Sequence, residues 1–188
     1  MIKKILFILS ATLSIATSKA DTAIFAGGCF WCMQPPFDAL IKKGVIKTTV
    51  GYTGGLKENP TYEETSSGGT GHREAIEVVF DSKKITYQEL VKIFWENIDP
   101  FDRDGQFCDK GEQYTSAIFY TNEAQKKAAE TSKPKGIVAT LILPAKKFYP
   151  AEGYHQSYYT KNPIRYKFYR FNCGRDKRLK EIWGHSSH

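Results

Sequence analysis

Two cysteines, Cys29 and Cys32, stand at CxxC spacing in the stretch AGGCFWCMQPP of residues 26–36. An apolar run typical of a strand precedes them at residues 22–26, and a pattern typical of a helix follows. Thiols at such a junction suit three kinds of chemistry: disulfide exchange by the pair, a metal site with a second pair, or attack by one thiolate beside an aromatic wall. The spacing alone leaves all three open.

Cys29 is the better-placed nucleophile of the two. Gly27 and Gly28 allow a tight turn just before it, and a helix N-terminus follows, whose free N–H groups lower the pKa of a nearby thiol. Phe30 and Trp31 beside it would form an apolar wall suited to a methyl or thioether group. The alternative is that both aromatic side chains belong to the core.

The other two cysteines, Cys108 and Cys173, lie far along the chain. A zinc site is a poor interpretation, because there is only one CxxC and no H-x₃₋₅-H pattern follows it. Four cysteines allow three full disulfide pairings, and the sequence does not choose among them. We expect Cys108, in a loop before Asp109, to be a buried and inert thiol.

A long loop at residues 51–71 contains six glycines and ends just before Glu74. Loops of this length inside a compact domain are usually functional. Glu74 opens a mostly apolar strand, so its carboxyl group would be partly buried and could stay protonated near neutral pH. Such a group can donate a proton to a leaving oxygen. The alternative is an exposed glutamate at a strand edge.

Several other polar side chains lie in or beside these loops. Tyr62 and Tyr114 are phenols among eleven tyrosines, so neither is distinctive alone. His72 is better read as a hydrogen-bonding loop residue than as a metal ligand. Acids such as Asp109 and Glu112 in a polar loop are most often simply solvated.

The order of the expected elements predicts an α/β (α+β) fold in a single domain. We expect strands at residues 22–26, 45–52, 75–80, 114–120 and 137–143, and helices at residues 34–42, 86–98, 122–132 and 151–161. The first helix is placed from residue 34 because Pro35 and Pro36 are tolerated only in a first turn. From residue 22 to residue 120 the order is β-α-β-β-α-β, which matches a ferredoxin-like split β-α-β core and not a thioredoxin order. Beyond residue 162 we expect a long, largely irregular C-terminal segment, with one basic helix at residues 176–183.

The first twenty residues have the features of a secretory signal. Lys3 and Lys4 precede an apolar stretch, and Ser18 and Ala20 are the small residues that a signal peptidase accepts. We therefore expect cleavage after Ala20, a mature domain at residues 21–188, a periplasmic or secreted location and no stable membrane insertion after cleavage. An uncleaved anchor is the alternative.

The charge of the mature chain is mildly basic. The signal carries three lysines and no acid, so 24 basic and 20 acidic side chains remain, a net charge of +4. Residues 161–180 contain eight Lys or Arg and one Asp. A solvated basic tail at residues 161–188 explains this excess as well as a partner does, and nothing demands nucleic acid.

Seven motifs in series resemble the peptide methionine sulfoxide reductases of the A type. They are Gly28-Cys29-Phe30-Trp31, Gly51-Tyr52-Thr53-Gly54-Gly55, Asn59-Pro60-Thr61-Tyr62, Thr70-Gly71-His72-x-Glu74, Phe94-Trp95-Glu96-Asn97 with Asp99-Pro100, Asp109…Gln113-Tyr114, and Phe148-Tyr149-x-Ala151-Glu152-x-x-His155-Gln156. The resemblance runs from residue 24 to residue 162 with no missing block. Enzymes of this class repair oxidised methionine, with one enzyme for each sulfoxide epimer.

The resemblance implies a role for each matching residue. Cys29 resembles the nucleophile that attacks the sulfoxide sulfur, and Glu74 resembles the acid that protonates the leaving oxygen. Tyr62 and Tyr114 resemble the phenols that hydrogen bond to this oxygen. The substrate-binding residues it implies are Phe30, Trp31, Asp109 and His155, with the two aromatics around the S-methyl group.

The cysteine that resolves the Cys29 sulfenic acid departs from one common family pattern. In that pattern a glycine follows the tryptophan and the resolving cysteines lie in a glycine-rich tail, whereas this chain has Cys32 after Trp31. Cys32 is three residues from Cys29 and needs little motion. Cys173 lies in the tail beside basic residues that favour a thiolate. Both stay candidates, with Cys173 ranked ahead of Cys32.

The resemblance thus predicts thiol-dependent reduction of methionine S-sulfoxide, free or in exported proteins. It implies no bound metal or cofactor and an external thioredoxin-like dithiol as reductant. Nothing in the sequence argues for a large apolar interface, so we expect a monomer. Two alternatives stay open: a thioredoxin-like disulfide oxidoreductase using Cys29 and Cys32, and a non-catalytic secreted binding module held by two disulfides. The first alternative does not explain Glu74, the glycine loop or the strand order.

Overall fold

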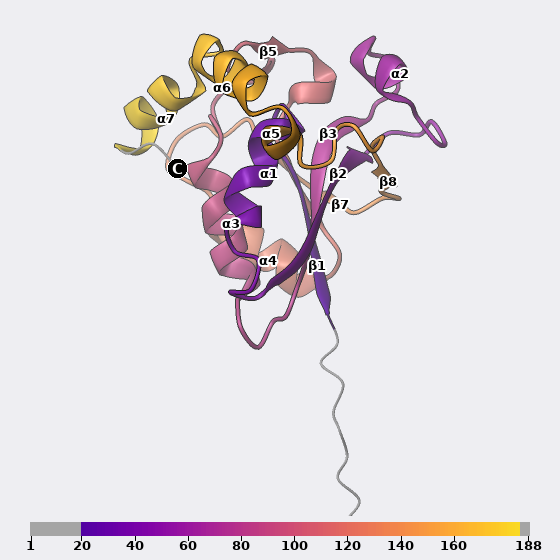
Figure 1. Cartoon of the computed structure of the whole chain (residues 1–188). Coiled ribbons are helices and arrows are strands. Elements are labelled where there is room, and N and C mark those ends of the chain that lie inside the picture. Colours follow the sequence, from indigo (N-terminus) through magenta and orange to yellow (C-terminus); the bar gives the residue numbers. More distant parts are fainter. Residues whose placement is uncertain (1–19, 185–188) are drawn as a thin grey trace, which may run out of the picture.

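A computed structural model of the chain describes residues 20–184 (Figure 1). The expected signal sequence lies outside these residues except for Ala20, so its cleavage stays a prediction. The described chain forms a central sheet with helices on one side and a strap of loop and short strands on the other. Among the described residues, no helix is both long enough and apolar enough to cross a membrane.

The main sheet has six strands in the order β7-β6-β1-β3-β2-β8. The strands are β1 (Asp21–Ala26), β2 (Val45–Thr53), β3 (Arg73–Phe80), β6 (Ala117–Tyr120), β7 (Leu141–Pro144) and β8 (Tyr149–Pro150). All neighbours are antiparallel except β6 and β7. The four central strands, β6-β1-β3-β2, have the arrangement that the β-α-β-β-α-β order predicts, so the split β-α-β core is confirmed.

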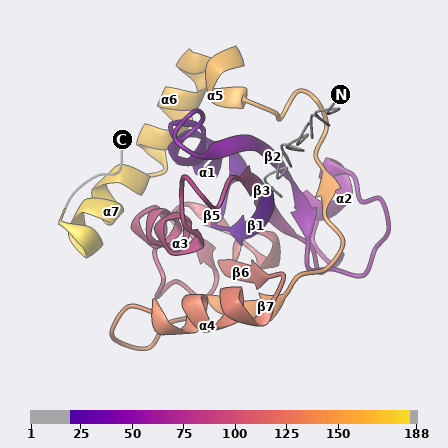
Figure 2. The same ribbon diagram turned by 90° about the horizontal axis from the view of Figure 1, so that it is seen from below.

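Helices α1 (Phe30–Asp38), α3 (Tyr87–Glu96) and α4 (Glu123–Thr131) cover one face of this sheet (Figure 2). Alternate residues of β1 explain why: Ala23 and Phe25 are fully buried against the helices, and Phe25 stacks on Phe37 of α1 and Phe94 of α3. The capping box of Thr86 and Glu89 fixes the start of α3.

The opposite face of the sheet is covered by chain that follows β7. Ile24 and Ala26 of β1 point to this side and form a second apolar cluster with Phe119 of β6. Leu143 and Phe148 pack against the cluster. The centre of the sheet is therefore buried on both faces. Packing on both faces fixes the end of β1 that leads into α1.

The start of the first helix is earlier than predicted. Helix α1 begins at Phe30 and contains Pro35 and Pro36 in its second turn, so the prediction of a start at residue 34 was wrong. Cys29 is the N-cap residue, as expected for the lead-in position. Packing of Met33 and Phe37 into the main core stabilises the two turns despite the N–H groups that proline lacks.

The C-terminal segment is helical, not largely irregular. It contains α6 (Pro163–Asn172) and α7 (Arg175–Trp183), of which only α7 was expected. The short helix α5 (Tyr158–Lys161) comes before them, where a longer helix at residues 151–161 was expected. Pro163 opens α6, which agrees with the preference of proline for the first turn of a helix. These helices lie over the start of α1, where α6 contributes the buried Tyr166 to a cluster with Cys29 and Cys32.

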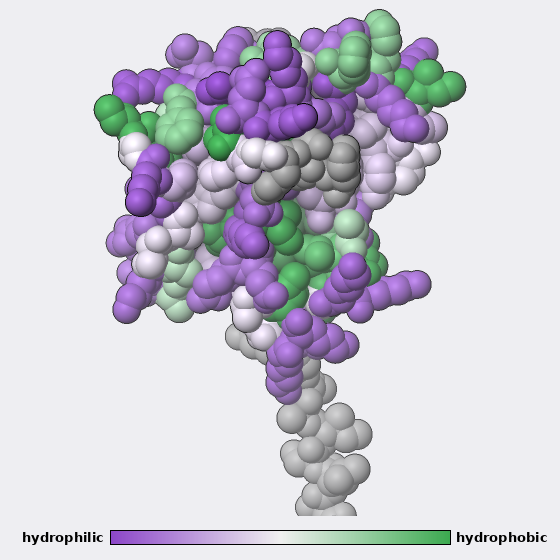
Figure 3. Space-filling model, turned by 90° about the vertical axis from the view of Figure 1, so that its left-hand side faces the viewer, coloured by the Kyte–Doolittle hydropathy of each residue, from purple (hydrophilic) through white to green (hydrophobic). Residues whose placement is uncertain are grey.

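Three shorter elements complete the fold. Strands β4 (Gly105–Gln106) and β5 (Asp109–Lys110) form a small hairpin, and α2 (Tyr62–Ser66) is a short helix within the glycine loop. A 3₁₀ turn at Glu112–Tyr114 replaces the start of the strand expected at residue 114. Figure 3 shows the side with α6 and α7, where hydrophilic side chains predominate at the top and a group of apolar side chains lies lower on the same face.

Candidate active site

Cys29 occupies the junction between β1 and α1. Gly28 before it has φ +76°, and a Cβ atom there would lie 2.5 Å from the Gln106 side chain. Glycine is thus needed for both the turn and the close approach. The amides of Cys32 and Met33 donate to the Cys29 carbonyl at 3.0 and 3.2 Å, which begins the helix directly behind the thiol.

Cys29 and Cys32 are free thiols, 6% and 1% exposed. Burial raises the pKa of Cys29, and its hydrogen bond to Cys32 adds to this. The same hydrogen bond, helped by the charges of Arg175 and Arg170, lowers the pKa of Cys32 to about 6 despite its burial. The expectation of a lowered Cys29 pKa was wrong, because desolvation outweighs the helix N-terminus. At neutral pH the pair holds one proton on Cys29 and a thiolate on Cys32.

Glu74 lies at the start of β3, next to the thiol. Its Oε2 accepts a hydrogen bond of 2.9 Å from the Phe30 amide, one residue after Cys29. The side chain is only 3% exposed, and burial raises its pKa to about 8 although the Phe30 amide opposes the rise. The carboxyl group is therefore mostly protonated at neutral pH, as the sequence predicted, and it can donate a proton.

One small cavity, of about 70 Å³, brings the predicted residues together. It is lined by Cys29, Phe30, Trp31, Tyr62, Glu74, Asp109, Tyr114 and Tyr169. Burial raises the pKa of Tyr62 to about 12 and raises that of Tyr114 further, so both phenols keep their protons and can donate hydrogen bonds. The cavity is large enough for a small apolar group and an oxygen.

Contacts from other elements hold the aromatic wall in place. The Trp31 indole N–H donates to His155 Nδ1 at 2.9 Å, and its ring stacks on Tyr158 at 3.8 Å. His155 is buried and packs against Phe30 and Tyr62. Burial lowers the pKa of His155, so the ring is neutral and accepts from Trp31. His155 thus lies behind the wall and orients it.

Glu152 positions Tyr62, a role that the residue patterns did not indicate. Its two oxygens accept from the Tyr62 amide at 2.9 Å and from the Tyr52 hydroxyl at 2.8 Å. Tyr52 is paired with Glu74 across β2 and β3. The carboxylate therefore ties α2 to the strands that carry the acid.

Tyr169 of α6 is the cavity residue that sequence reasoning missed. Its hydroxyl donates to Asp109 Oδ2 and is within hydrogen-bonding reach of the Cys29 sulfur, where such a bond lowers the thiol pKa. Aromatic residues at 166 and 169 have the spacing of one helix face, but the segment was expected to be irregular. That spacing is the signal that could have revealed Tyr169.

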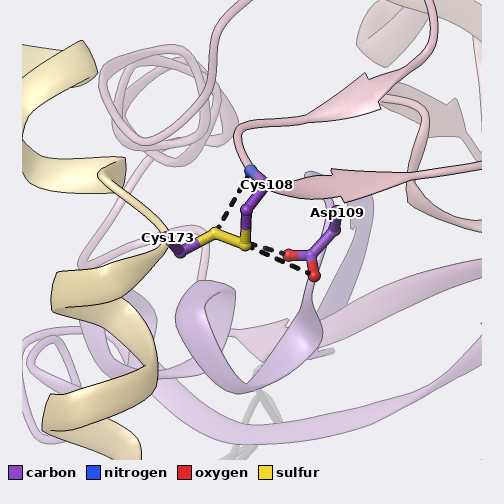
Figure 4. A group of neighbouring side chains, drawn as sticks. All are labelled: Cys108, Asp109 and Cys173. Carbon is purple, nitrogen blue, oxygen red and sulfur yellow. Dashed lines mark hydrogen bonds between the residues drawn. A yellow bond between two sulfur atoms is a disulfide. The ribbon is translucent and has the colours of Figure 1, made fainter.

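The remaining two cysteines are joined to each other. Cys108 on the β4–β5 hairpin forms a disulfide with Cys173 at the end of α6, and Cys108 is exposed (Figure 4). The expectation of a buried, inert Cys108 thiol was therefore wrong. Asp109 also lies beside both sulfurs, and these three residues are the one cluster of three metal-type side chains in residues 20–184. Its two sulfurs are already used in the disulfide.

A larger, open hollow of about 890 Å³ lies elsewhere, along the glycine loop between Gly54 and Arg73. No thiol lines it. His72 in this loop hydrogen bonds to the Lys57 carbonyl at 2.7 Å and to the Gly55 amide at 3.2 Å. This confirms that His72 is a loop hydrogen-bonding residue.

A buried thiol pair facing a protonated carboxyl group and two phenols defines a thiol-based oxidoreductase that acts on a small polar oxygen beside an apolar group. A family model described as peptide methionine sulfoxide reductase matches residues 21–187. This chain belongs to that family, and with it to the enzymes that reduce methionine sulfoxide with electrons from thiols and without a bound cofactor.

Curated relatives and solved structures agree with the family. The peptide methionine sulfoxide reductase MsrA of Bacillus licheniformis is 52% identical over 174 residues, which cover 88% of this chain and 95% of the relative. The reduced form of Mxr1 from Saccharomyces cerevisiae has a TM-score of 0.72 at 33% identity, covering 78% and 87% of the two chains. The methionine sulfoxide reductase A of Corynebacterium diphtheriae has a TM-score of 0.68 at 34% identity, covering 79% and 78%.

Proposed function

We propose that this chain reduces the S epimer of methionine sulfoxide, free or in proteins, with Cys29 as nucleophile and Glu74 as acid. The observation that carries the proposal is that Cys29 and Glu74 line one cavity and that the Glu74 pKa is raised to about 8. A sulfoxide sulfur is a weak electrophile until its oxygen accepts a proton. A neutral acid beside a thiol supplies what this reaction needs.

The first step uses the shared proton of the two cysteines. The Cys32 thiolate takes the Cys29 proton along their hydrogen bond, so the thiolate forms on Cys29 when substrate is present. Cys29 attacks the sulfoxide sulfur while Glu74 protonates the oxygen and Tyr62 and Tyr114 donate hydrogen bonds to it. A bond forms between the two sulfurs, the sulfur–oxygen bond breaks, and the protonated oxygen leaves as hydroxide. This hydroxide then adds to the Cys29 sulfur, the bond between the two sulfurs breaks, methionine leaves, and Cys29 is left as a sulfenic acid.

Cys32 is the resolving thiol in this proposal. It is free and hydrogen bonded to Cys29, whereas Cys173 is joined to Cys108. The structure therefore supports the reverse of the order expected from sequence. The Cys32 sulfur attacks the Cys29 sulfenic acid, water leaves, and a Cys29–Cys32 disulfide forms.

A thioredoxin-like dithiol protein is the proposed reductant of the oxidised enzyme. Mxr1, which shares 33% identity with this chain in its reduced form, has also been solved in complex with Trx2. We also propose, from the sequence, that the chain acts as a monomer on exported proteins, in the periplasm or outside the cell. The features of a signal in the first twenty residues support this location.

The experiment that tests the function uses residues 21–188, a small dithiol and each separate epimer of a blocked methionine sulfoxide. We expect reduction of the S epimer only, measured as blocked methionine by chromatography. Reduction of neither epimer, with disulfide exchange on a reporter substrate, would show that the chain is a disulfide oxidoreductase instead. The variant Cys32→Ser separates the two further, because it removes recycling and the proposed acceptor of the Cys29 proton but leaves Cys29 and Glu74 to complete one slower turnover.

A further inference from the structure

Helix α6 lies at the outside of the molecule, over the start of α1, and exposes three large apolar side chains (Figure 1). Ile164, Phe168 and Phe171 are 83%, 70% and 82% exposed. At positions i, i+4 and i+7 they lie within about 60° of one another around the helix axis, so they form one face, here called the α6 stripe. Single exposed apolar residues are ordinary, whereas a group rimmed by polar residues marks an interaction surface.

The opposite side of α6 faces the active site. Tyr166 is buried in a cluster with Cys29 and Cys32, and Tyr169 lines the cavity. Both positions are turned away from the α6 stripe by roughly 140–160°, at about 100° per residue. Packing of α6 on the domain uses this inner side, so the fold does not account for the α6 stripe.

Two cations flank the α6 stripe, one on each side. Arg165 and Lys167 hold these positions, and both side chains are exposed. In residues 20–184 the ion pair of α6 joins Arg170 to Asp176, which leaves Arg165 and Lys167 without an acidic partner. Apolar side chains with Lys and Arg at their margins are typical of a helix that lies in a membrane interface. There the apolar groups enter the lipid and the cations reach the phosphates.

The positive charge continues beyond the margins of the α6 stripe. Residues 161–180 contain eight Lys or Arg and one Asp. Helix α7 follows α6 after two residues and exposes Lys177 and Lys180. Cations near an anionic lipid surface each add to the attraction, so this end of the molecule matches a negatively charged membrane.

Other occupants of the α6 stripe fit this charge less well. A symmetric dimer pairs the same surface of both chains, so a second copy would bring its Arg165 and Lys167 close to those of the first. Residues 185–188 have no apolar side chain that could cover the stripe. Residues 1–19 are absent from the mature chain that we expect, and they precede β1, which starts at the end of the molecule far from α6 (Figure 1).

We propose that the α6 stripe is a docking surface for a membrane that contains anionic lipids. Ile164, Phe168 and Phe171 enter the interface between headgroups and acyl chains, and the two flanking cations bind lipid phosphates. The contact is shallow and reversible, because three side chains bury far less apolar surface than a membrane-spanning helix does. Lipid binding is independent of the sulfoxide chemistry, since no residue of the α6 stripe lines the cavity.

Binding through this face determines where the active site works. The α6 stripe and the cavity lie on opposite sides of one helix, and a helix with its side chains is about 10 Å across. A docked chain therefore holds Cys29 close to the membrane surface. The substrates within reach are oxidised methionines of proteins attached to that membrane or protruding from it. This choice of substrate rests on the proposed function, whereas lipid binding does not.

The first test measures binding of the mature chain, residues 21–188, to sedimented vesicles. Phosphatidylcholine vesicles with about 30% phosphatidylglycerol should bind at least about tenfold more protein than phosphatidylcholine alone. Phe168→Ser/Phe171→Ser should lower this binding at least about tenfold, because it removes the apolar contact. Arg165→Gln/Lys167→Gln should lower it at least about fivefold, because each cation adds to the attraction. No binding to the anionic vesicles would overturn the proposal.

The loop at residues 133–137 supplies matched controls. Lys133 and Lys135 are exposed there and Ile137 is 79% exposed, but the loop presents one apolar side chain and no stripe. Lys133→Gln/Lys135→Gln removes the same charge as the α6 variant, and Ile46→Ser/Ile137→Ser removes two exposed apolar side chains. Both should bind like the parent, and melting curves check that every variant is folded. Equal losses in control and α6 variants would show adsorption by net charge alone and would overturn the proposal.

The second test asks whether the α6 stripe enters the lipid. Phe171→Trp places an indole on the stripe, and Ile137→Trp places one in the control loop. The anionic vesicles are prepared with phosphatidylcholine that carries bromine on its acyl chains. They should quench at least about half of the fluorescence added in Phe171→Trp, because interfacial helices bury their apolar face about 5–10 Å deep. The indole of Ile137→Trp should keep its fluorescence, and equal quenching in the two variants would contradict lipid contact by α6.

Sedimentation equilibrium without vesicles tests a second copy of the chain as the occupant. We expect a monomer for the parent. A dimer that Phe168→Ser/Phe171→Ser converts to a monomer would assign the α6 stripe to self-association and overturn the proposal. None of these measurements needs turnover, so a failure of lipid binding leaves the proposed function intact, and a failure of sulfoxide reduction leaves lipid binding intact.

Discussion

The two cysteine pairs differ most in what covers them. Cys29 and Cys32 are enclosed by aromatic side chains at the start of α1, whereas Cys108 stands exposed on a hairpin and Cys173 ends a surface helix. Each pair has a nearby carboxyl group whose pKa is raised by burial, Glu74 at the first and Asp109 at the second. Activation of a sulfoxide needs a dry site with a neutral acid, while exchange with another protein needs an accessible sulfur. The enclosed pair meets the first demand, because its Cys29 shares a small cavity with Glu74.

The largest effect should come from the buried pair. Cys29→Ser should lower sulfoxide reduction by at least about a thousandfold, because no other thiol faces Glu74. Single-turnover formation of methionine measures this without recycling. Cys173→Ser is the comparison from the exposed pair and should keep single turnover far above that of Cys29→Ser. Equal losses in the two variants would remove the distinction between the pairs.

The two carboxyl groups should differ next. Glu74→Gln should slow the chemical step by roughly two to four orders of magnitude, the usual worth of a positioned acid. Asp109→Asn removes a carboxyl from the same cavity without touching the proposed proton donor, so it should cost less. Rapid-quench measurement of the first turnover gives both values. An unchanged rate for Glu74→Gln would exclude Glu74 from the mechanism.

The raised pKa of Glu74 also makes a prediction for stability. The group ionises near pH 4.5 in the unfolded chain and near pH 8 in the folded protein, so the folded state binds more protons in this window. Stability should therefore fall as pH rises from about 4.5 to 8 and then level off, and activity should fall above pH 8 as the acid loses its proton. In Glu74→Gln this part of the fall should disappear, which raises the melting temperature at pH 9 by at least about 2 °C relative to the parent. If the melting temperatures of the two proteins change with pH in the same way, the raised pKa does not belong to Glu74.

Arg175 should matter through Cys32. Its guanidinium is 1% exposed, donates to the carbonyls of Asn97 and Gly27, and helps to lower the Cys32 pKa. Arg175→Met should raise the pH at which Cys32 reacts with a small alkylating agent above about 6, measured by mass spectrometry of the Cys32 peptide. Arg178→Met on the same helix is the control, because Arg178 pairs with Asp99. An unmoved midpoint in Arg175→Met would show that the hydrogen bond from Cys29 and the charge of Arg170 lower the Cys32 pKa without Arg175.

The smallest effect should come from Tyr169, which joins the two regions. Tyr169→Phe loses hydrogen bonds worth about 1 kcal/mol, so turnover should fall by roughly fivefold. Tyr159→Phe is the matched control, since its hydroxyl bonds to Asp38. Steady-state rates with a small dithiol compare the two. A larger loss in Tyr159→Phe would mean that helix packing, and not the hydroxyl, explains the effect.

Local patterns predicted the parts of the fold that depend on neighbours in sequence. The order of strands and helices from β1 to β6 followed from apolar periodicity, and Cys29 and Glu74 followed from their places beside glycine-rich turns. The start of α1 was wrong because packing of Met33 and Phe37 outweighs the cost of Pro35 and Pro36. Helix α6 was missed although local signals for it exist, namely Pro163 at its start and the spacing of Tyr166 and Tyr169.

The features that sequence did not predict depend on contacts between distant segments. The Cys108–Cys173 bond spans 65 residues, and nothing local distinguishes it from the other possible pairings. The place of Tyr169 against Asp109 depends on how α6 lies over α1. The raised Cys29 pKa reflects its burial, and the aromatic side chains packed around the two thiols come from α1, α5 and α6.

The antiparallel pairing of β1 with β3 has a consequence for how this protein tolerates insertions. Cys29 follows the end of β1 and Glu74 opens β3, so the adjacent ends of two neighbouring strands set the distance between thiol and acid. The long glycine loop leads into Glu74 but does not determine where it lies. A Cβ atom added at Gly68 or Gly69, at the tip of this loop, would have no other part of the protein within 4 Å. A peptide tag or a small domain inserted there should lengthen the loop and leave the reacting groups in place, which makes this tip the natural point for engineering new substrate-binding segments.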